Sequence, residues 1–315
     1  MNVPQLFSKL SAELSTKIIG KTDIIEEIFI ALLCDGHILL EGVPGTAKTI
    51  IANSISKSIN CSFKRIQFTP DLLPSDILGT FVFSLKTREF ELRRGPIFAN
   101  FILADEINRA PPKTQAALLE CMQETQVTLE GYTYKLKVPF IVIATQNPID
   151  MEGTYPLPEA QLDRFMFKSN LTYPSRDEEI RLLAMKNLPD KEIKSVISPA
   201  DIEALKKELS TVKIDESIYV YITDIIQKIR GLPDIELGPG PRASIAFLKG
   251  AKAYALMSGR EYVIPDDVKR LGYPILRHRI RLKPEAQIAG ITVSQLISKA
   301  VNEVPIPKVM DKSRK

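Results

Sequence analysis

The chain has 315 residues, 44% of them hydrophobic and 25% charged, with a formal net charge of +4. This composition is typical of a folded globular chain rather than a disordered one. The small net charge excludes nucleic-acid binding driven by a global basic field, so any such role needs a local patch. The length predicts two domains. The sequence shows no secretory leader and no apolar run of ~20 residues, so we expect a cytoplasmic protein without membrane insertion.

The first predicted strand, residues 38–40, runs into a glycine-containing loop and then into a predicted helix at residues 50–55. Strand, loop and helix in this order are typical of a phosphate-binding loop. The residues predicted to bind nucleotide here are Gly42, Val43, Pro44, Gly45, Thr46, Ala47, Lys48 and Thr49. Backbone N–H groups would hold the β-phosphate, Lys48 would neutralise β and γ oxygens, and Thr49 would offer its hydroxyl to Mg²⁺. The alternative is a glycine-rich turn that only ends the strand.

The common form of this loop has glycine directly before the lysine, where this chain has Ala47. Alanine favours an ordinary helical φ at that position. We therefore expect the left-handed turn of the loop to fall earlier, at Gly45.

Further apolar strands are predicted at residues 63–68, 101–105, 140–145 and 165–167, separated by amphipathic helices. This alternation indicates a parallel sheet covered on both faces. Two β-hairpins interrupt it, one turning at Lys86-Thr87 and one at Glu130-Gly131. Each hairpin is either surface decoration or a contact surface for a partner.

Polar side chains follow two of these strands. Asp105 and Glu106 end the third strand, at the sheet edge where open α/β proteins bind ligands. Asp105 would orient Mg²⁺, and Glu106 would polarise the water that attacks the γ-phosphate. Asn147 follows the strand at 140–145 and would hold that water, although an asparagine that only opens the turn before Pro148 is an alternative.

Helical periodicity replaces the strand pattern after Pro174. Ser175 and Glu178 form a predicted capping box, and Ser198-Pro199 begins a further predicted helix. We therefore expect an α/β domain at residues 1–174, an all-helical domain at 175–303 and a flexible tail at 304–315.

The order of these motifs resembles the AAA+ ATPases. The phosphate loop (Walker A), Asp105-Glu106 (Walker B) and Asn147 are followed by an Asp163-Arg164 motif and by Arg242 in a helical lid. In detail, residues 41–49, 104–113, 144–148 and 157–165 resemble the MoxR family, in which alanine before the lysine is usual. The resemblance implies a P-loop NTPase (AAA+) α/β domain, with a parallel sheet flanked by helices and two hairpin inserts, followed by an all-α lid domain.

The resemblance also implies roles for single residues. Arg164 would be an arginine finger that reaches the γ-phosphate of a neighbouring subunit, the alternative being a local ion pair with Asp163. Arg242 would bind the nucleotide of its own subunit, and Ile19 and Gly20 would contact adenine. Arg109 would face a subunit interface or simply lie on the surface at a helix start.

For the whole protein, the resemblance implies an enzyme that hydrolyses ATP with Mg²⁺ in a ring, a hexamer. The ring would remodel, activate or mature a client protein, often one with a von Willebrand factor A domain, and the outcome in the family includes metal-cofactor insertion. Lys48, Glu106, Asn147 and Arg164 would be catalytic, with Thr49 and Asp105 as metal ligands.

Two other functions remain open at this stage. A nucleic-acid motor or loader is the first, because the hairpins carry basic and aromatic side chains: Lys86, Arg88, Arg93, Arg94, Tyr132, Tyr134, Lys135 and Lys137. Interspersed Glu89, Glu91 and Glu130, with the weak net charge, favour ordinary solvated faces or protein contact over nucleic-acid binding. The second is a small-molecule kinase, which is disfavoured because Glu106, Asn147 and Arg242 together suit attack by water.

Overall fold

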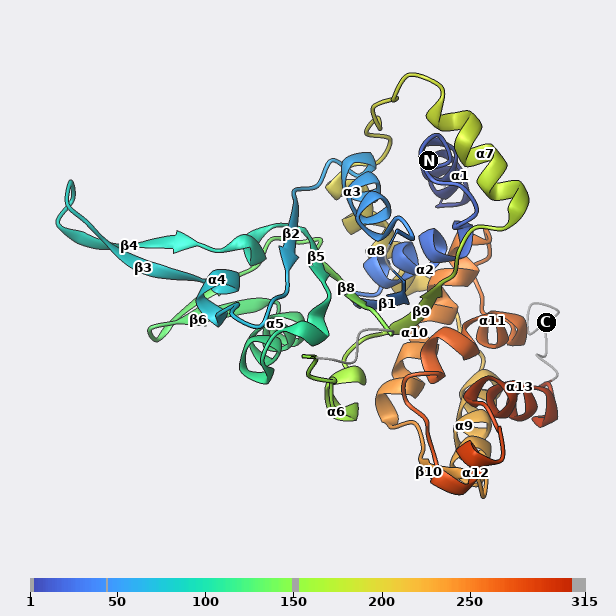
Figure 1. Cartoon of the computed structure of the whole chain (residues 1–315). Helices are drawn as coiled ribbons and strands as arrows, with labels where there is room; N and C mark the ends of the chain where they lie inside the picture. Colours follow the sequence, from blue (N-terminus) through green and yellow to red (C-terminus); the bar gives the residue numbers. More distant parts are fainter. Residues whose placement is uncertain (1–2, 44, 149–152, 308–315) are drawn as a thin grey trace.

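The computed structural model describes residues 3–43, 45–148 and 153–307. A five-stranded sheet lies at its centre, in the order β2-β5-β8-β1-β9, and all neighbouring strands are parallel (Figure 1). The strands are β1 (Ile38–Gly42), β2 (Phe63–Gln67), β5 (Phe101–Asp105), β8 (Ile141–Gln146) and β9 (Phe167–Leu171). The predicted parallel sheet is therefore confirmed.

The predicted strand at residues 165–167 is placed wrongly, because β9 begins only at Phe167. Phe165 is fully buried, as its apolar side chain suggested, but its N–H bonds the carbonyl of Leu162 in a turn. The carbonyl of Phe165 accepts from His278 and Arg279. These bonds replace a strand ladder at this position.

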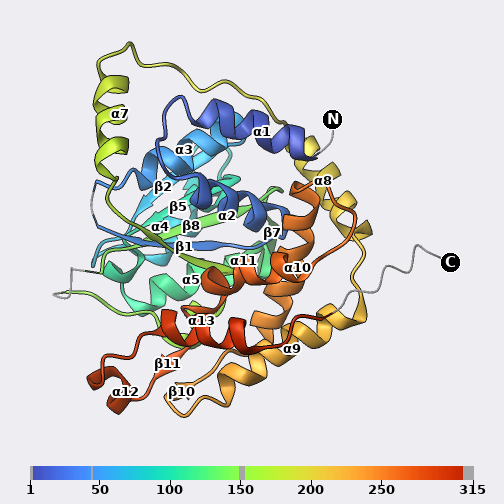
Figure 2. The ribbon, with the colours of Figure 1, turned by 90° about the vertical axis from the view of Figure 1, so that its right-hand side faces the viewer.

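The two faces of the sheet pack against different helices, as the alternation of strand side chains requires. On one face, Ile38, Leu40 and Leu103 belong to a large core that includes α1, α2 and α3 and the helices of the C-terminal part. On the other face, Leu39 and Ile102 belong to a smaller core with α5. The helices of the first part are α1 (Val3–Leu14), α2 (Thr22–Leu33), α3 (Lys48–Ser58), α4 (Pro74–Leu78), α5 (Pro112–Glu124) and α6 (Glu159–Leu162). Figure 2 shows α1, α2 and α3 above β1 and α9, α11 and α13 below it.

After β9 the described chain is mainly helical, with a small pairing of β10 (Ile235–Leu237) and β11 (Arg281–Leu282) and an isolated bridge between Lys213 and Tyr262. The helices of this part are α7 (Arg176–Lys186), α8 (Pro199–Thr211), α9 (Glu216–Arg230), α10 (Pro241–Met257), α11 (Pro265–Leu276), α12 (Pro284–Ile288) and α13 (Val293–Glu303). The predicted capping box of Ser175 and Glu178 begins α7, and Ser198 caps α8 with Pro199 at its first position. Among the described residues, none of the helices is both long enough and apolar enough to span a bilayer.

Both predicted hairpins are present, and they project from the same side of the molecule (Figure 1). The longer pairs β3 (Gly79–Ser84) with β4 (Glu89–Arg94), and the shorter pairs β6 (Gln126–Leu129) with β7 (Tyr132–Lys135). The ring centroids of Phe81 and Tyr132 lie 6.2 Å apart, so the two hairpins contact each other through aromatic side chains. Tyr134 of the shorter hairpin also packs against Phe98, in the turn that follows β4, with ring centroids 6.4 Å apart.

Candidate active site

The phosphate loop leaves the C-terminal end of β1 at Gly42 and enters α3 at Lys48. Gly45 has the predicted left-handed φ, of 84°, but Ala47 is left-handed as well, with a φ of 65°. The expectation of an ordinary helical φ at Ala47 is therefore wrong. Ala47 is the residue before α3 rather than the first residue inside it, so its backbone makes the turn that aims the helix. Pro44 lies outside the described residues.

Glycine is required at Gly42 for space. A Cβ at this position would lie 2.7 Å from the carbonyl oxygen of Leu171 and 2.8 Å from its Cβ, because β1 and β9 pair there. The loop thus leaves the sheet where only a backbone without a side chain fits.

Lys48 folds back over the phosphate loop. Its Nζ donates to the carbonyl of Gly42 at 2.6 Å, and Val43 O lies 3.4 Å away. Burial lowers the pKa of Lys48, while the nearby charges of Asp105 and Glu106 act in the opposite direction. The ammonium of Lys48 is therefore held inside the phosphate loop, where a bound phosphate would lie.

Asp105 lies at the same edge of the sheet as the phosphate loop, because both follow the C-terminal ends of parallel strands. Thr145 of β8 donates its hydroxyl to Asp105 Oδ1 at 2.6 Å, and the same hydroxyl accepts from the N–H of Glu106 at 2.8 Å. Arg65 of β2 donates to Asp105 Oδ2 from Nε at 3.0 Å and from Nη2 at 2.6 Å. Neighbouring strands thus fix the orientation of Asp105.

The side chain of Glu106 extends this network to other partners. Its φ of 58° is left-handed, an uncommon conformation for glutamate that is often found at functional sites. Its Oε2 accepts from Gln67 Nε2 and from Arg109 Nη1, both at 3.0 Å. The structure therefore places Arg109 on the candidate catalytic carboxylate.

Three residues of this network, Arg65, Gln67 and Thr145, were not predicted from the sequence. Arg65 and Gln67 are two positions apart on β2, so they share a face, and Gln67 pairs with Asp105 across the sheet. That alternation was the available signal, but it points to Asp105 only once the strand order is known.

Asn147 follows β8 directly and is buried. Since β8 lies between β5 and β1, Asn147 lies at the sheet edge between the ends of the strands that carry Asp105 and the phosphate loop. The structure thus brings the predicted catalytic carboxylates, amide and lysine to one edge, which we call the loop edge.

The loop edge also suits a magnesium ion. Thr49, in the first turn of α3, and Asp105 present a hydroxyl and a carboxylate, which are the hard oxygen ligands that Mg²⁺ prefers, along with phosphate oxygens. Bound there with ATP, the ion would neutralise charge on the β and γ oxygens.

Gly20 also lies near the loop edge. The next residue, Lys21, donates from Nζ to the carbonyl of Thr172 at 2.9 Å, and Thr172 follows the end of β9. Gly20 is exposed with a φ of 68°, and a Cβ there would overlap the carboxylate of Glu178. Ile19 is half-buried. The pair predicted to contact adenine therefore lies on the same side of the sheet as the phosphate loop.

Arg164 is not at the loop edge. It lies in the turn 163–166 before β9, which we call the Arg164 segment, and Met166 N donates to the carbonyl of His37, just before β1. The segment is therefore at the N-terminal ends of the strands, which we call the opposite edge. The five residues of β1 separate it from the phosphate loop by roughly 15 Å, at ~3.3 Å per residue.

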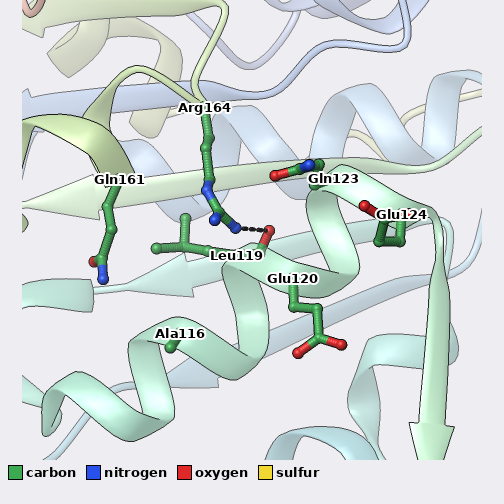
Figure 3. A pocket seen from close by; sticks show the side chains of 7 residues that line it. All are labelled: Ala116, Leu119, Glu120, Gln123, Glu124, Gln161 and Arg164. Carbon is green, nitrogen blue, oxygen red and sulfur yellow. Dashed lines mark hydrogen bonds between the residues drawn. The ribbon is translucent and has the colours of Figure 1, made fainter.

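The side chain of Arg164 reaches a cavity of about 320 Å³ beside α5 (Figure 3). Its Nη1 donates to the carbonyl of Leu119 at 3.0 Å, whereas its buried Nε has no hydrogen-bond partner within the described part of the chain. The cavity is lined by Ala116, Leu119, Glu120, Gln123, Glu124, Gln161 and Arg164. The alternative of a local ion pair with Asp163 is not observed.

Asp163 instead binds two other arginines. Arg279 Nε donates to Asp163 Oδ1 at 2.7 Å, and Arg242 Nη1 lies 3.4 Å from Oδ2. Arg242 is thus beside the Arg164 segment, at the opposite edge. The resemblance implied that Arg242 would bind the nucleotide of its own chain, but the structure places this side chain at the opposite edge, away from that chain's phosphate loop.

Both histidines are buried at the opposite edge. His37 Nδ1 accepts from the N–H of Val142, its Nε2 lies 2.9 Å from the carbonyl of Met122, and burial lowers its pKa to about 4. Burial also holds the pKa of His278 well below its ordinary value, and its Nε2 lies 3.0 Å from the carbonyl of Phe165. Both rings are therefore neutral supports for the backbone.

A parallel sheet in this strand order, with a phosphate loop, a strand-end Asp-Glu pair and an asparagine at one edge, defines a P-loop ATPase of the AAA class. In agreement, the family described as "ATPase family associated with various cellular activities (AAA)" matches residues 37–167, and an AAA lid domain matches residues 229–300, here called the lid. A crystal structure described as that of a candidate ATPase from Cytophaga hutchinsonii superposes with a TM-score of 0.91 at 42% identity, covering 97% of this chain and 96% of the other.

Comparison with known sequences narrows the class. The chain is 49% identical to YeaC of Bacillus subtilis, covering 96% of this chain and 95% of that protein, and 40% identical to the chaperone MoxR1 of Mycobacterium tuberculosis, covering 94% and 81%. It is 27% identical to the protein MoxR of Paracoccus denitrificans, covering 96% of each. The chain belongs to the MoxR family of AAA+ ATPases.

Proposed function

We propose that this ATPase works as a ring, a hexamer, in which each nucleotide is held by one subunit and attacked with help from the next. The observation that carries the proposal is the separation of Arg164 from its own phosphate loop by the length of β1. A guanidinium at the opposite edge cannot reach a γ-phosphate at the loop edge of the same chain. It can do so in a head-to-tail assembly, where the opposite edge of one subunit meets the loop edge of its neighbour.

Within one subunit, the loop edge would bind ATP and Mg²⁺ and prepare the water. Residues 42–49 would cradle the phosphates, Lys48 would neutralise their charge, and Thr49 and Asp105 would hold the ion. Glu106 would act as general base, which requires it to exchange its contact with Arg109 for one with water. Asn147 would hold the same water, and Ile19 and Gly20 would contact adenine.

From the neighbouring subunit, Arg164 would stabilise the charge that develops on the transferred phosphoryl group. Because Arg242 shares the opposite edge, we extend the proposal to it: Arg242 would meet the neighbour's nucleotide rather than its own. Within the described residues, its side chain has one contact, at 3.4 Å from Asp163, so Arg242 can exchange partners.

The work done by the ring would be to remodel, activate or mature a partner protein. Large apolar side chains are exposed on the longer hairpin, namely Val82, Phe83, Leu85 and Phe90, and such a patch suits protein rather than nucleic acid. The relative MoxR1 is named a chaperone. We propose a client with a von Willebrand factor A domain, with metal-cofactor insertion as one outcome, in the cytoplasm.

A division at residue 174 into nucleotide-binding and helical domains is part of the same proposal.

The ring is tested by Arg164→Ala, assayed for ATP turnover per subunit at high protein concentration. A loss on the order of 10³-fold or more is expected, because arginine fingers are worth ~10³–10⁵ in turnover. Turnover equal to wild type would show that the finger model is wrong.

The client is tested with Glu106→Gln, which should hold ATP without hydrolysing it. Stable, ATP-dependent retention of a purified von Willebrand factor A domain is expected, and salt-sensitive stimulation by DNA without such retention would favour the nucleic-acid motor.

A further inference from the structure

The stretch that follows α11 contacts the Arg164 segment with side chains that are fully enclosed. The side chain of Arg279 is only 3% exposed, and its guanidinium donates in three directions to this segment. Nε bonds the carboxylate of Asp163, Nη2 bonds the carbonyls of Phe165 at 2.6 Å and Asp163 at 3.2 Å, and Nη1 bonds the carbonyl of Met166 at 3.2 Å. Nη1 also bonds Ile275 O, within α11 itself.

These bonds are more than a buried charge needs for neutralisation, since the carboxylate of Asp163 alone would supply that. Three backbone carbonyls within four residues accept from one planar group, which fixes the path of the segment as well as its charge. His278 adds a contact to the carbonyl of Phe165. The lid therefore determines where the backbone on either side of Arg164 lies.

Arg242 offers a comparison on the same carboxylate. It touches Asp163 by one contact of 3.4 Å and is 49% exposed, so solvent or phosphate can replace Asp163 as its partner. Arg279 has no such freedom, because each of its nitrogens is bonded inside the protein. Of the two arginines on Asp163, one is exchangeable and one is fixed.

The same stretch also approaches the start of the phosphate loop. Arg277 Nη2 lies 3.8 Å from Glu41 Oε2, and Lys168 Nζ lies 2.9 Å from Glu41 Oε1. Glu41 directly precedes Gly42. Two neighbouring lid arginines therefore contact the two edges of the sheet, one beside the loop edge and one at the opposite edge.

We propose that Arg279 is a positioning residue for the ATPase reaction: it holds the Arg164 segment against the lid so that Arg164 is presented to the nucleotide of the adjacent subunit. The inference rests on the ring proposed above. It assigns to Arg279 an effect on the neighbour's active site and none on nucleotide binding by its own chain.

The test is Arg279→Gln, assayed alone and in an equal mixture with Glu106→Gln. Alone, Arg279→Gln should bind ATP normally and lose turnover by about 100-fold, because a misplacement of ~1 Å can cost that much. In the mixture, sites that combine the loop edge of an Arg279→Gln subunit with the Arg164 segment of a Glu106→Gln subunit are intact. Random mixing across head-to-tail interfaces should then restore about a quarter of wild-type turnover per site.

Two controls separate this role from a structural one. Arg260→Gln removes another lid arginine, half-buried and paired with the buried Asp267, which has no bond to the Arg164 segment in the described part of the chain; at equal loss of thermal stability it should keep its turnover. Arg164→Ala mixed with Glu106→Gln should be restored in the same way as the Arg279 variant. If Arg279→Gln does not fold, Arg279→Lys takes its place in the mixture, because lysine keeps the charge beside Asp163 but lacks the planar group that bonds the carbonyls of the Arg164 segment.

The outcomes decide between the two proposals. If the Arg164→Ala mixture regains turnover and the Arg279→Gln mixture does not, the positioning role is wrong and the ring stands. If neither mixture regains turnover, the neighbour-completed site is wrong and the positioning role falls with it. Full turnover of Arg279→Gln alone would also overturn the inference.

Discussion

At the loop edge the functional side chains come from the ends of β1, β5 and β8, whereas at the opposite edge they come from a turn and from the lid. The first group is brought together by strand order alone, and Thr145 joins Asp105 and Glu106 across neighbouring strands. The second depends on Arg279, a residue more than a hundred positions further along the chain. Nucleotide binding therefore depends on strand order, whereas the position of Arg164 depends on the lid. A mutation should be able to impair one without the other.

The largest expected effect on ATP binding lies at the loop edge. Lys48→Ala should raise the Kd for ATP about 100-fold, because a charge-assisted contact contributes about 1.5–3 kcal/mol. Arg164→Ala should leave that Kd unchanged. Fluorescent-nucleotide titration measures both, with Lys57→Ala, an exposed lysine on the same helix, as the control. Weakened binding by Arg164→Ala would erase the distinction between the edges.

The strand-to-strand connection is tested by Thr145→Val. The change removes the hydroxyl that bonds both Asp105 and Glu106, so turnover should fall by about 10–100-fold, as for other residues that orient metal ligands. Steady-state ATP hydrolysis across Mg²⁺ concentrations measures it. Thr128→Val makes the same substitution on the exposed shorter hairpin and should change nothing; an equal loss in both variants would contradict the role of Thr145.

Acid should lower the free energy of unfolding, because both histidines are buried at the opposite edge in their neutral form. The native pKa of His37 is about 4, below its ordinary 6.5, so the unfolded chain takes up a proton first as the pH falls. The stability due to neutral His37 is therefore present above pH 6.5 and lost progressively towards pH 4, by about 3 kcal/mol in all.

Glu27 offsets this loss of stability, because its raised pKa makes the folded state more stable as the pH falls. Burial raises the pKa of Glu27 to about 7, although its hydrogen bond from Ser169 opposes this, so its contribution to stability is present below pH 4.5 and lost as the pH rises to 7. Urea unfolding of Glu27→Gln should show a clear fall in stability from pH 6.5 to 4.5. Glu208→Gln, exposed on α8, should retain the flatter profile of the wild type; a flat profile in Glu27→Gln would contradict the assignment.

The smallest effect concerns the left-handed residues of the phosphate loop. Ala47→Gly relieves a left-handed alanine but frees the unfolded chain, and these terms of about 1 kcal/mol nearly cancel. Gly45→Ala gains no such relief at a φ of 84° and should destabilise by about 1 kcal/mol. Thermal unfolding compares the two, and a larger loss in Ala47→Gly would mean that its Cβ makes contacts that matter.

The sequence predicted the loop edge well, because each of its motifs directly follows an apolar strand. Strand β5 was predicted with its observed bounds, and parallel strands place their ends together. The conformation of Ala47 could not be inferred, since alanine has no intrinsic preference for a left-handed φ. Arg65 and Gln67 needed the strand order, which local periodicity does not contain.

The opposite edge was predicted less completely, because its contacts join residues far apart in the chain. Arg164 was identified through a motif, but Asp163 was not foreseen as the partner of Arg242 and Arg279. Phe165 looked like part of a strand, since burial alone does not distinguish a strand from a turn that lid side chains hold.

The contact between the two hairpins has a mechanical consequence. Phe81 and Tyr132 join them, and β6 follows α5 after a single residue, so α5 is the element to which a load on either tip would be passed. Leu119, on that helix, is the residue whose carbonyl holds the guanidinium of Arg164. If a client binds the hairpins, as proposed above, its pull would act on the helix whose Leu119 carbonyl accepts from Arg164, and would thereby couple the hairpins to the proposed arginine finger.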